Sequence, residues 1–484
     1  MHKLAASITL ALLVSLMACG GSSSGNSNSG DGSPSITVGP TSASIHVKEK
    51  TQLTANVQNM GNTYVSWAVQ ESNGGTIVPT SSGAIYTAPG NVGDYHVVVT
   101  SVADPTKSAT ATVNVYGEFL SLQKLVGGTN LPWSVRPFST TFASDGTWST
   151  SGFVDPQTCG LDPASCKPLD TNAYDIYLST DGKKAVASIP VEGTYQGETR
   201  YFFDIVIADT TPLTINQLTH NETNTSVLIR DYSPQLSPDG TLITFEHVAP
   251  DPNSNGDSRS MIATMNVDGS NLQTLLPYDP MDETTWKNAW FPTFSPDGTK
   301  LAAEVWWNEE DGNFVDGIAT MNVDGSGFKQ LTESYNSTSD WCYDTMPAYA
   351  SDGQKIAFTH ECSLQSGGYN DMLFIMNADG TNVTQLHGAP TPDVMACQPR
   401  AFADNQIIFS SNEAAPGTDA FDMYSILPDG SKLTRITNNN LYDGFSIWWM
   451  GYNSTTAAAR AVQKATPVQQ RLDHLKTARE HKRK

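Results

Sequence analysis

Basic residues are scarce in this chain of 484 residues, which has 27 Lys and Arg against 49 Asp and Glu and a net charge of −22. Nucleic-acid binding needs a basic surface to neutralise phosphates, so this balance argues against a nucleic-acid partner. Long apolar runs are also lacking, because the run from Ala5 to Ala18 is too short to span a membrane. No P-loop, His-Glu-x-x-His or Cys-x-x-Cys motif occurs, so the sequence gives no support to the sites that these motifs build.

The short apolar run has the features of an export signal. It follows a basic start at Met1–Lys3 and ends in Leu16-Met-Ala-Cys19. This ending resembles a bacterial lipobox, which implies that residues 1–18 are a lipoprotein signal peptide and that Cys19 carries the lipid. An ordinary signal peptide with a chance cysteine is the alternative. Gly20 resembles the residue that follows the cysteine in outer-membrane lipoproteins, so we expect a lipid-anchored protein of the cell envelope, periplasmic or surface-facing.

Two segments precede the main part of the chain. Residues 19–34 are rich in Gly, Ser and Asn and predict a flexible tether. Residues 35–116 contain short segments that alternate apolar and polar residues between turns, as in a β-sandwich. The segments that begin at Ala88-Pro-Gly90 and at Ala103-Asp-Pro-Thr106 resemble bacterial Ig-like surface domains. The resemblance implies a spacer, with an adhesion module as the alternative.

Pairs of Asp-Gly turns organise the remainder of the chain. Ser237-Pro-Asp-Gly240 joins two predicted strands, and Asn266-Val-Asp-Gly-Ser270 joins the next two. The first turn recurs at 179–182, 295–298, 351–353 and, degraded, 403–405, and the second at 322–326, 377–381 and 427–431. Four antiparallel strands in each step of about 50–58 residues predict the blades of a β-propeller.

These repeats resemble the TolB-type propeller repeat, which the propellers of prolyl-oligopeptidase-like enzymes share. The segments Gln217-Leu-Thr219, Gln330-Leu-Thr332 and Arg435-Ile-Thr437 fit its blade-ending strand. The resemblance covers roughly residues 118–450 and implies the fold rather than a function. Blades are expected at about 174–219, 231–276, 289–332, 344–387 and 397–437.

Ring closure sets the expected number of blades. Asp443–Trp449 resembles the first strand of one more blade, and partners from residues 118–150 would leave no exposed edge. We therefore expect an all-β chain in which an Ig-like sandwich precedes a propeller of six blades, with seven as the fallback. Residues 451–484 form a basic C-terminal tail. A peptidase of the propeller-plus-hydrolase type needs a long catalytic domain after the propeller, and this short tail argues against one.

Export permits disulfides, and the cysteine positions indicate two. Cys159 and Cys166 lie close together in a Gly, Asp and Pro loop and are expected to pair. Cys342 precedes the first strand of a blade and Cys362 follows its second strand, so the blade topology brings them together. Cys397 enters the neighbouring blade on the same face and is the competing partner.

Two histidines occupy the same position of two blades. His247 and His360 each follow the Asp of the first turn by eight residues. Some TolB-like propellers are sugar-acid lyases that hold a divalent metal with histidines near the axis. That resemblance implies His247, His360 and Gln398 as candidate ligands and Arg400 as a clamp for a substrate carboxylate. A third histidine is missing, and two ordinary strand-end residues are the alternative.

Two further candidate sites lie on the predicted loops. One has oxygen donors at alternate positions, as in the first half of a calcium loop, although Ile262 stands where the distal glutamate belongs: Asp251, Asn253, Asn255 and Asp257. The other is a ligand face built from exposed aromatic residues and two polar ones: Trp286, Trp307, Trp341, Tyr343, Gln398 and Arg400. Polar surface loops and packing between blades are the respective alternatives.

The sequence therefore favours non-catalytic binding of a protein or a cell-envelope glycan, because the scaffold is clear and no catalytic set is complete. The alternative function is a carbohydrate-active propeller, a sugar-acid lyase or glycan binder, that uses a divalent metal with His247, His360 and Arg400. Calcium is the cofactor for which the sequence offers a candidate loop. These two functions differ in whether alanine at the three residues abolishes turnover.

Overall fold

The computed structural model describes most of the chain between residues 32 and 445, and the regular structure there is almost entirely β. The described residues are 32–124, 135–152, 154–155, 167–168, 172–210, 213–250, 258–275, 287–308, 314–333, 341–363, 369–388, 394–418, 420–439 and 441–445. Two 3-10 turns lie within these ranges, η3 (Asn221–Thr223) and η4 (Ala403–Asn405). The predicted all-β fold is confirmed. No helix in the described ranges is long and apolar enough to cross a membrane.

The first part of the described chain is a β-sandwich. One sheet has the order β1 (Ser35–Gly39), β3 (Lys50–Gln58), β6 (Gly83–Thr87) and β5 (Thr76–Thr80). The other has the order β2 (Ser42–His46), β8 (Ser108–Lys124), β7 (Gly93–Ser101) and β4 (Val65–Val69). Leu53 and Tyr86 of the first sheet pack with Val97 and Val113 of the second in a shared core. Alternation of apolar and polar residues along each strand places one face of each sheet in this core.

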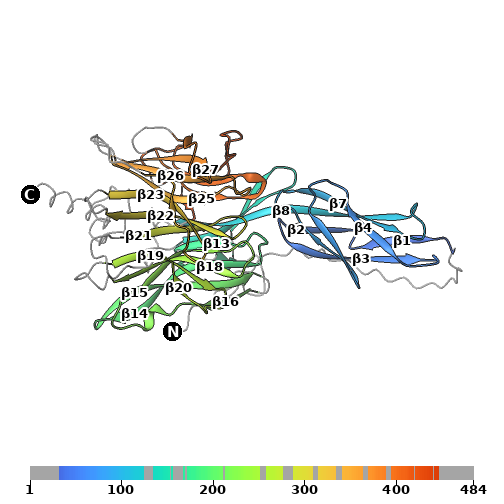
Figure 1. Ribbon diagram of the computed structural model, residues 1–484, viewed down its shortest axis with the longest axis horizontal. Helices are drawn as coiled ribbons and strands as arrows, with labels where there is room; N and C mark the ends of the chain where they lie inside the picture. Colours follow the sequence, from blue (N-terminus) through green and yellow to red (C-terminus); the bar gives the residue numbers. More distant parts are fainter. Residues whose placement is uncertain are drawn as a thin grey trace, which may run out of the picture.

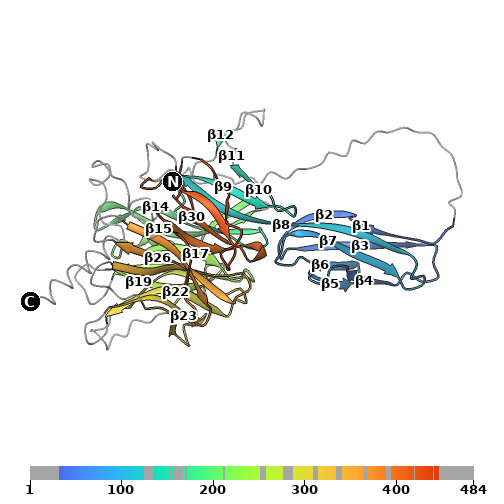
Figure 2. The ribbon, with the colours of Figure 1, turned by 90° about the horizontal axis from the view of Figure 1, so that it is seen from above.

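Strand β8 continues from the sandwich into the propeller without a break (Figure 1). Tyr116 is the last residue that pairs with β2, and Gly117 is the first that pairs with β9. An added Cβ at Gly117 would lie 2.7 Å from the ring of Phe402, so only glycine fits this crossing. The expected boundary near residue 117 therefore falls inside one strand, and the sandwich projects from one side of the propeller in both views (Figure 2).

The propeller consists of antiparallel sheets, each with its innermost strand on the channel. Ordered from the innermost strand outwards, the groups are β33 (Asp443–Gly444), β8, β9 (Val135–Phe142) and β10 (Trp148–Gly152); β13 (Asp175–Leu178), β14 (Lys184–Tyr195), β15 (Glu198–Thr210) and β16 (Leu213–Gln217); β17 (Arg230–Leu236), β18 (Leu242–Pro250), β19 (Ser258–Asn266) and β20 (Gln273–Thr274); β21 (Lys287–Phe294), β22 (Lys300–Asn308), β23 (Phe314–Asn322) and β24 (Lys329–Gln330); β25 (Trp341–Tyr349), β26 (Lys355–Ser363), β27 (Tyr369–Asn377) and β28 (Thr384–His387); β29 (Ala396–Ala401), β30 (Ile407–Ser411), β31 (Asp422–Ile426) and β32 (Thr434–Arg435). A single parallel residue pair joins β15 to β17. A separate pair is β11 (Val154–Asp155) with β12 (Lys167–Pro168).

The repeated turns have the same hydrogen bonds in each copy. Asp239 Oδ1 accepts hydrogen bonds from Ser237 Oγ at 2.6 Å and from the backbone N–H of Thr241 at 3.1 Å. Asp297 is held by Ser295 in the same way. The glycine that follows has a positive φ, 71° at Gly240. The sequence Ser-Pro-Asp-Gly therefore specifies these tight turns locally, because Asp satisfies the turn backbone and Gly tolerates its conformation.

Apolar side chains between neighbouring sheets form the core of the propeller. Ile205 of β15, for example, packs with Ile243, Phe245 and Met265 of the next group. The ring closes where the last described strand, β33, pairs with β8 through Asp443 and Gly444. Closure of the ring by the final strand against residues 118–150 is therefore confirmed, and it leaves β8 without a free inner edge.

Candidate ligand-binding cavity on the propeller axis

Four consecutive innermost strands carry the same irregularity. In β17, β21, β25 and β29 the pairing with the next strand shifts at a bulge. A non-glycine residue with positive φ precedes a proline at each bulge: Ser233 (50°), Phe291 (49°), Met346 (52°) and Gln398 (58°). Proline cannot donate a ladder hydrogen bond, so within a central strand it requires a bulge. Positive φ costs about 1–2 kcal/mol for such residues, and strain of this kind gathers at functional sites.

The four bulges surround the narrow part of a central channel. Ser233, Phe291, Met346 and Gln398 line a cavity of about 50 Å³. A wider cavity of about 280 Å³ lies on the side of the sandwich and has walls from all the innermost strands. Gln235, Arg400 and Phe445 line both cavities, so the two are parts of one channel.

We call the wider part the axial cavity. Its walls are mainly apolar, and the following residues define it: Glu118, Tyr177, Tyr349, Asp352, Arg400 and Phe445 from the propeller, and Lys48 and Asn91 from the sandwich. Small-molecule sites are typically about 300–1,000 Å³, mostly apolar, with a few polar groups that fix the ligand. At about 280 Å³ the axial cavity fits a small ligand or one group of a larger one.

Arg400 is the cation of the propeller that faces this cavity. Its guanidinium carbon lies 4.5 Å from the ring centroid of Phe445 and 5.2 Å from that of Tyr177. Nη1 donates a hydrogen bond to the carbonyl oxygen of Ile176 at 3.3 Å. The ion pairs in the described part of the chain do not include Arg400. Burial lowers the pKa of this half-buried group from its usual value, but a guanidinium stays protonated.

Gln398 holds the closing strand rather than a ligand. Its side chain is buried, its Oε1 accepts a hydrogen bond from the backbone N–H of Phe445, and its Nε2 donates to the hydroxyl of Tyr442, both at 3.2 Å. The backbone N–H of Gln398 donates to Thr359 Oγ1 at 3.2 Å. The residue proposed as a metal ligand thus lies on the axis with its side chain already engaged.

The two predicted histidines lie outside the linings of both cavities. His247 Nδ1 lies 2.7 Å from Asp231 Oδ1, and His360 Nδ1 lies 2.7 Å from Asp344 Oδ1. Each Asp and His are directly opposite each other on the first two strands of their group. The equivalent position of the two histidines therefore reflects a repeated cross-strand pair, and the structure does not bring them to Arg400.

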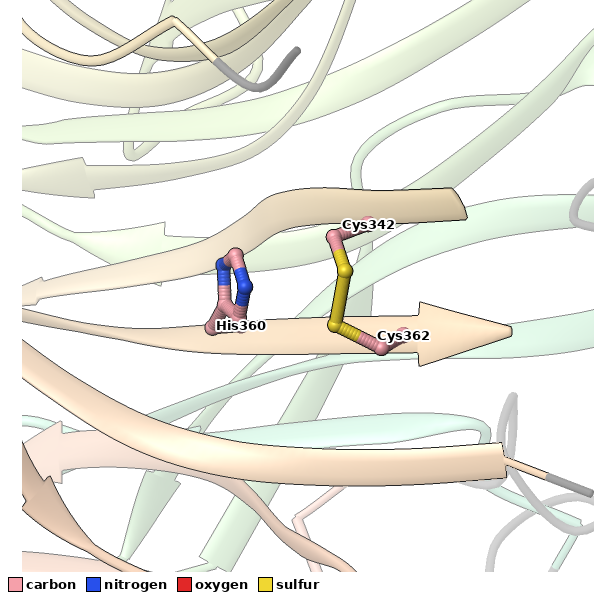
Figure 3. A group of neighbouring side chains, drawn as sticks. All are labelled: Cys342, His360 and Cys362. Atoms are coloured by element: carbon pink, nitrogen blue, oxygen red, sulfur yellow. A yellow bond between two sulfur atoms is a disulfide. The ribbon is translucent and has the colours of Figure 1, made fainter. Parts of the chain in front are cut away.

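The predicted disulfide between Cys342 and Cys362 is present and links β25 to β26. Within the described ranges, a group of three metal-type ligand atoms within 4.8 Å of one another occurs once, at Cys342, His360 and Cys362 (Figure 3). Its two sulfur atoms are bonded to each other, so this group cannot offer thiolates to a metal. The competing partner, Cys397, is a buried free thiol, and burial raises its pKa well above the usual value.

The predicted ligand face is wrong at Tyr343, which is only 4% exposed and packs in the interior. Its position at the start of a first strand turns the side chain inwards. Several predicted site residues, or their side chains, lie outside the described residues: Cys19, Cys159, Cys166, Asp251, Asn253, Asn255, Asp257, Trp286, Trp307 and Trp341.

Two features of the site were missed in the sequence although a signal was present for one of them. A proline precedes the Asp of the first turn by five residues in four repeats, at Pro234, Pro292, Pro347 and Pro399. Proline inside a predicted central strand indicates a bulge, so this period could have located the narrow part of the channel. The walls that come from the sandwich have no such signal, because they depend on how two folded units pack.

No family model matches the chain, and no curated protein matches it. Among solved structures, it is similar to the β-propeller domain of the Trilobed protease from Pyrococcus furiosus, with 13% identity, a TM-score of 0.36, and coverage of 67% of this chain and 86% of that chain. It is also similar to oligogalacturonate lyase from Vibrio parahaemolyticus, with 11% identity, a TM-score of 0.37, and coverage of 75% of this chain and 97% of that one.

A third similar structure is hydrazine synthase from Kuenenia stuttgartiensis, with 11% identity and a TM-score of 0.43. Coverage there is 68% of this chain and 46% of that one. At these identities a likeness concerns the fold alone. The strand pairing described above is what shows the fold, and by that pairing the chain is a β-propeller protein.

Proposed function

We propose that this chain is an exported, lipid-anchored binding protein whose propeller holds a carboxylate-bearing ligand in the axial cavity without changing it chemically. The observation that supports the proposal is Arg400, a protonated guanidinium in an apolar cavity with one hydrogen bond to a backbone carbonyl. A desolvated cation without a counter-charge is unfavourable. A carboxylate relieves that cost, because it accepts two parallel hydrogen bonds from a guanidinium.

The rest of the cavity indicates the body of the ligand. Tyr177, Tyr349 and Phe445 line the cavity beside Arg400, so an apolar or ring-shaped group fits next to the carboxylate. The ligand is a small organic acid, or the acidic group of a cell-envelope glycan or protein. Both sources share the carboxylate, and the test below separates them.

The chain order supports a position away from the membrane. Ser35 pairs with Gln58 at the end of β3 that is remote from the propeller. If Cys19 is lipidated, the tether of residues 19–34 leaves the sandwich at that end. The sandwich then holds the cavity beyond the surface of the outer membrane, in the periplasm or outside the cell.

The test is calorimetric titration of the full-length chain with three kinds of probe. These are free aromatic and aliphatic carboxylates, a uronic-acid oligosaccharide, and a peptide with an acidic C-terminus. Arg400→Gln should weaken the binding of the best probe by about 30-fold or more, as expected for a charge-assisted pair worth about 2 kcal/mol. Arg200→Gln, on the exposed part of β15, is the matched control and should leave it unchanged. The proposal is wrong if no probe binds, or if both variants bind alike.

The same experiment distinguishes binding from catalysis. A carbohydrate-active propeller would convert the uronic-acid probe to an unsaturated product, which absorbs in the ultraviolet. That function needs His247, His360 and Arg400 at one place, whereas the two histidines pair with Asp231 and Asp344 outside the cavity lining. We therefore expect binding without product.

A further inference from the structure

The sandwich contributes walls to the axial cavity as well as extending the chain. Val47, Lys48, Gly90 and Asn91 line the cavity opposite the inner strands of the propeller. They belong to two turns at the end of the sandwich that adjoins the propeller. The site is thus composite, and its mouth exists only while the two units stay docked.

Several contacts fix this docking. His46 Nε2 lies 2.7 Å from Glu118 Oε2, and the ring of His46 packs so closely on a blade turn that a Cβ at Gly182 would lie 2.5 Å from it. On another blade, the backbone N–H of Val92 donates to Asp404 Oδ1 at 3.0 Å. Contacts to two separate blades hold the turns of the sandwich in one place over the cavity.

Lys48 lies in a defined position on this wall. Its φ is 62°, and its backbone N–H donates to the carbonyl oxygen of Pro89 at 3.0 Å. Its side chain passes over Gly90, where an added Cβ would lie 3.7 Å from Lys48 Cε. A non-glycine residue in the left-handed region costs free energy, and such residues gather at functional positions.

The charges around the cavity leave both cations available. The carboxylate of Glu118 is engaged by His46 and by the hydroxyl of Ser139. Asp352 accepts hydrogen bonds from Asn405 Nδ2 and from the backbone N–H of Gln354, both at 2.8 Å. Lys48, like Arg400, takes part in none of the ion pairs between described residues.

We propose that the ligand of the axial cavity carries two acidic groups, one bound by Arg400 and the other by Lys48, so that it bridges the propeller and the sandwich. The proposal rests on the proposed binding function and adds its ligand class, an organic diacid with an apolar middle. In a chain with a net charge of −22, two unpaired cations on one apolar cavity form a local site for such an anion. Burial lowers the pKa of Lys48, which agrees with a position at the cavity rather than in open solvent.

The test compares straight-chain dicarboxylates of four to ten carbons with monocarboxylates of equal length, by calorimetric titration of the full-length chain. At the best length the dicarboxylate should bind at least tenfold more tightly than its monocarboxylate. Lys48→Gln should reduce that advantage to twofold or less, and Lys48→Arg should keep most of it. Lys50→Gln is the matched control, since Lys50 is exposed on the neighbouring strand β3 and does not line the cavity.

Failure of the diacid proposal looks different from failure of the binding function. If monocarboxylates bind through Arg400 and dicarboxylates bind no better at any length, the bridging role of Lys48 is wrong and the binding function stands. The same conclusion follows if Lys48→Gln and Lys50→Gln behave alike. If no carboxylate binds, the proposed function is wrong and the bridge falls with it.

Discussion

The Asp–His pairs of the blades and the Arg400 side chain on the axis treat a charged group in opposite ways. Both Asp231 oxygens have partners, His247 Nδ1 and Asn221 Nδ2, each at 2.7 Å. Arg400 has one backbone acceptor and two aromatic rings, and its other donors face a cavity. Histidines with carboxylate neighbours resemble a site in the sequence, yet their bonds are used within the fold. In this propeller, donors left without a protein acceptor indicate the ligand better than residue type does.

The largest effect in this comparison is expected from breaking a saturated pair. Asp231→Ala leaves His247 and Asn221 without their buried acceptor, so the free energy of unfolding should fall by about 4 kcal/mol. Urea denaturation measures this loss. Carboxylate binding at Arg400 should stay within twofold in the variant that remains folded. A loss of binding with unchanged stability would instead place the Asp–His pair in the site.

The next effect concerns a paired group whose charge depends on pH. Burial by itself would lower the pKa of His46, but hydrogen bonds to Glu118 and Glu49 outweigh it and raise the pKa to about 9. Because the folded-state value lies above the ordinary 6.5, this stabilisation is complete below pH 6.5 and is lost as the pH rises through 9.

Wild type and His46→Gln should therefore be compared by urea denaturation at pH 6, 7.5 and 9.5. The stability advantage of wild type should shrink by about 3 kcal/mol over this range. His96→Gln is a suitable control, because His96 has one carboxylate partner, Glu71, and a more exposed side chain. An advantage that is constant with pH would show that His46 acts through packing alone.

A smaller effect is expected at the bulges. Ser233 has a φ of 50°, which glycine adopts without penalty, so Ser233→Gly should raise the free energy of unfolding by up to about 1 kcal/mol. Ser237→Gly, at a turn where the Oγ is used, should destabilise the chain. Thermal unfolding of both variants measures the difference. Destabilisation by Ser233→Gly would mean that the bulge is not under strain.

The smallest effect is expected from Arg400 in the absence of ligand. Arg400→Met removes an unpaired cation and keeps much of the apolar stem, so stability should change by less than about 0.5 kcal/mol. Thermal unfolding without any carboxylate measures it. A large loss would show that the guanidinium serves the fold, and the contrast with the Asp–His pairs would disappear.

Local sequence predicted the parts of the fold that local chemistry decides. The Ser-Pro-Asp-Gly turns, the disulfide of Cys342 with Cys362 and closure by Asp443 follow from turn residues and the order of repeats. Arg400 was identified as a carboxylate clamp, but with the two histidines as companions. Its companion from the sandwich, Lys48, could not be identified, because the docking of two units decides which side chains share a cavity.

Strand β8 also sets the order in which the molecule can be completed. Its inner partner in the ring, Asp443, lies 320 residues after Gln123. At the usual rate of synthesis that interval lasts roughly 16–64 s. Until then the sandwich can be finished while the part of β8 beyond it has an open edge, which is a template for pairing with other chains. Ring assembly is therefore the slow, concentration-sensitive stage of maturation, and we expect chaperone protection to matter most for this one strand.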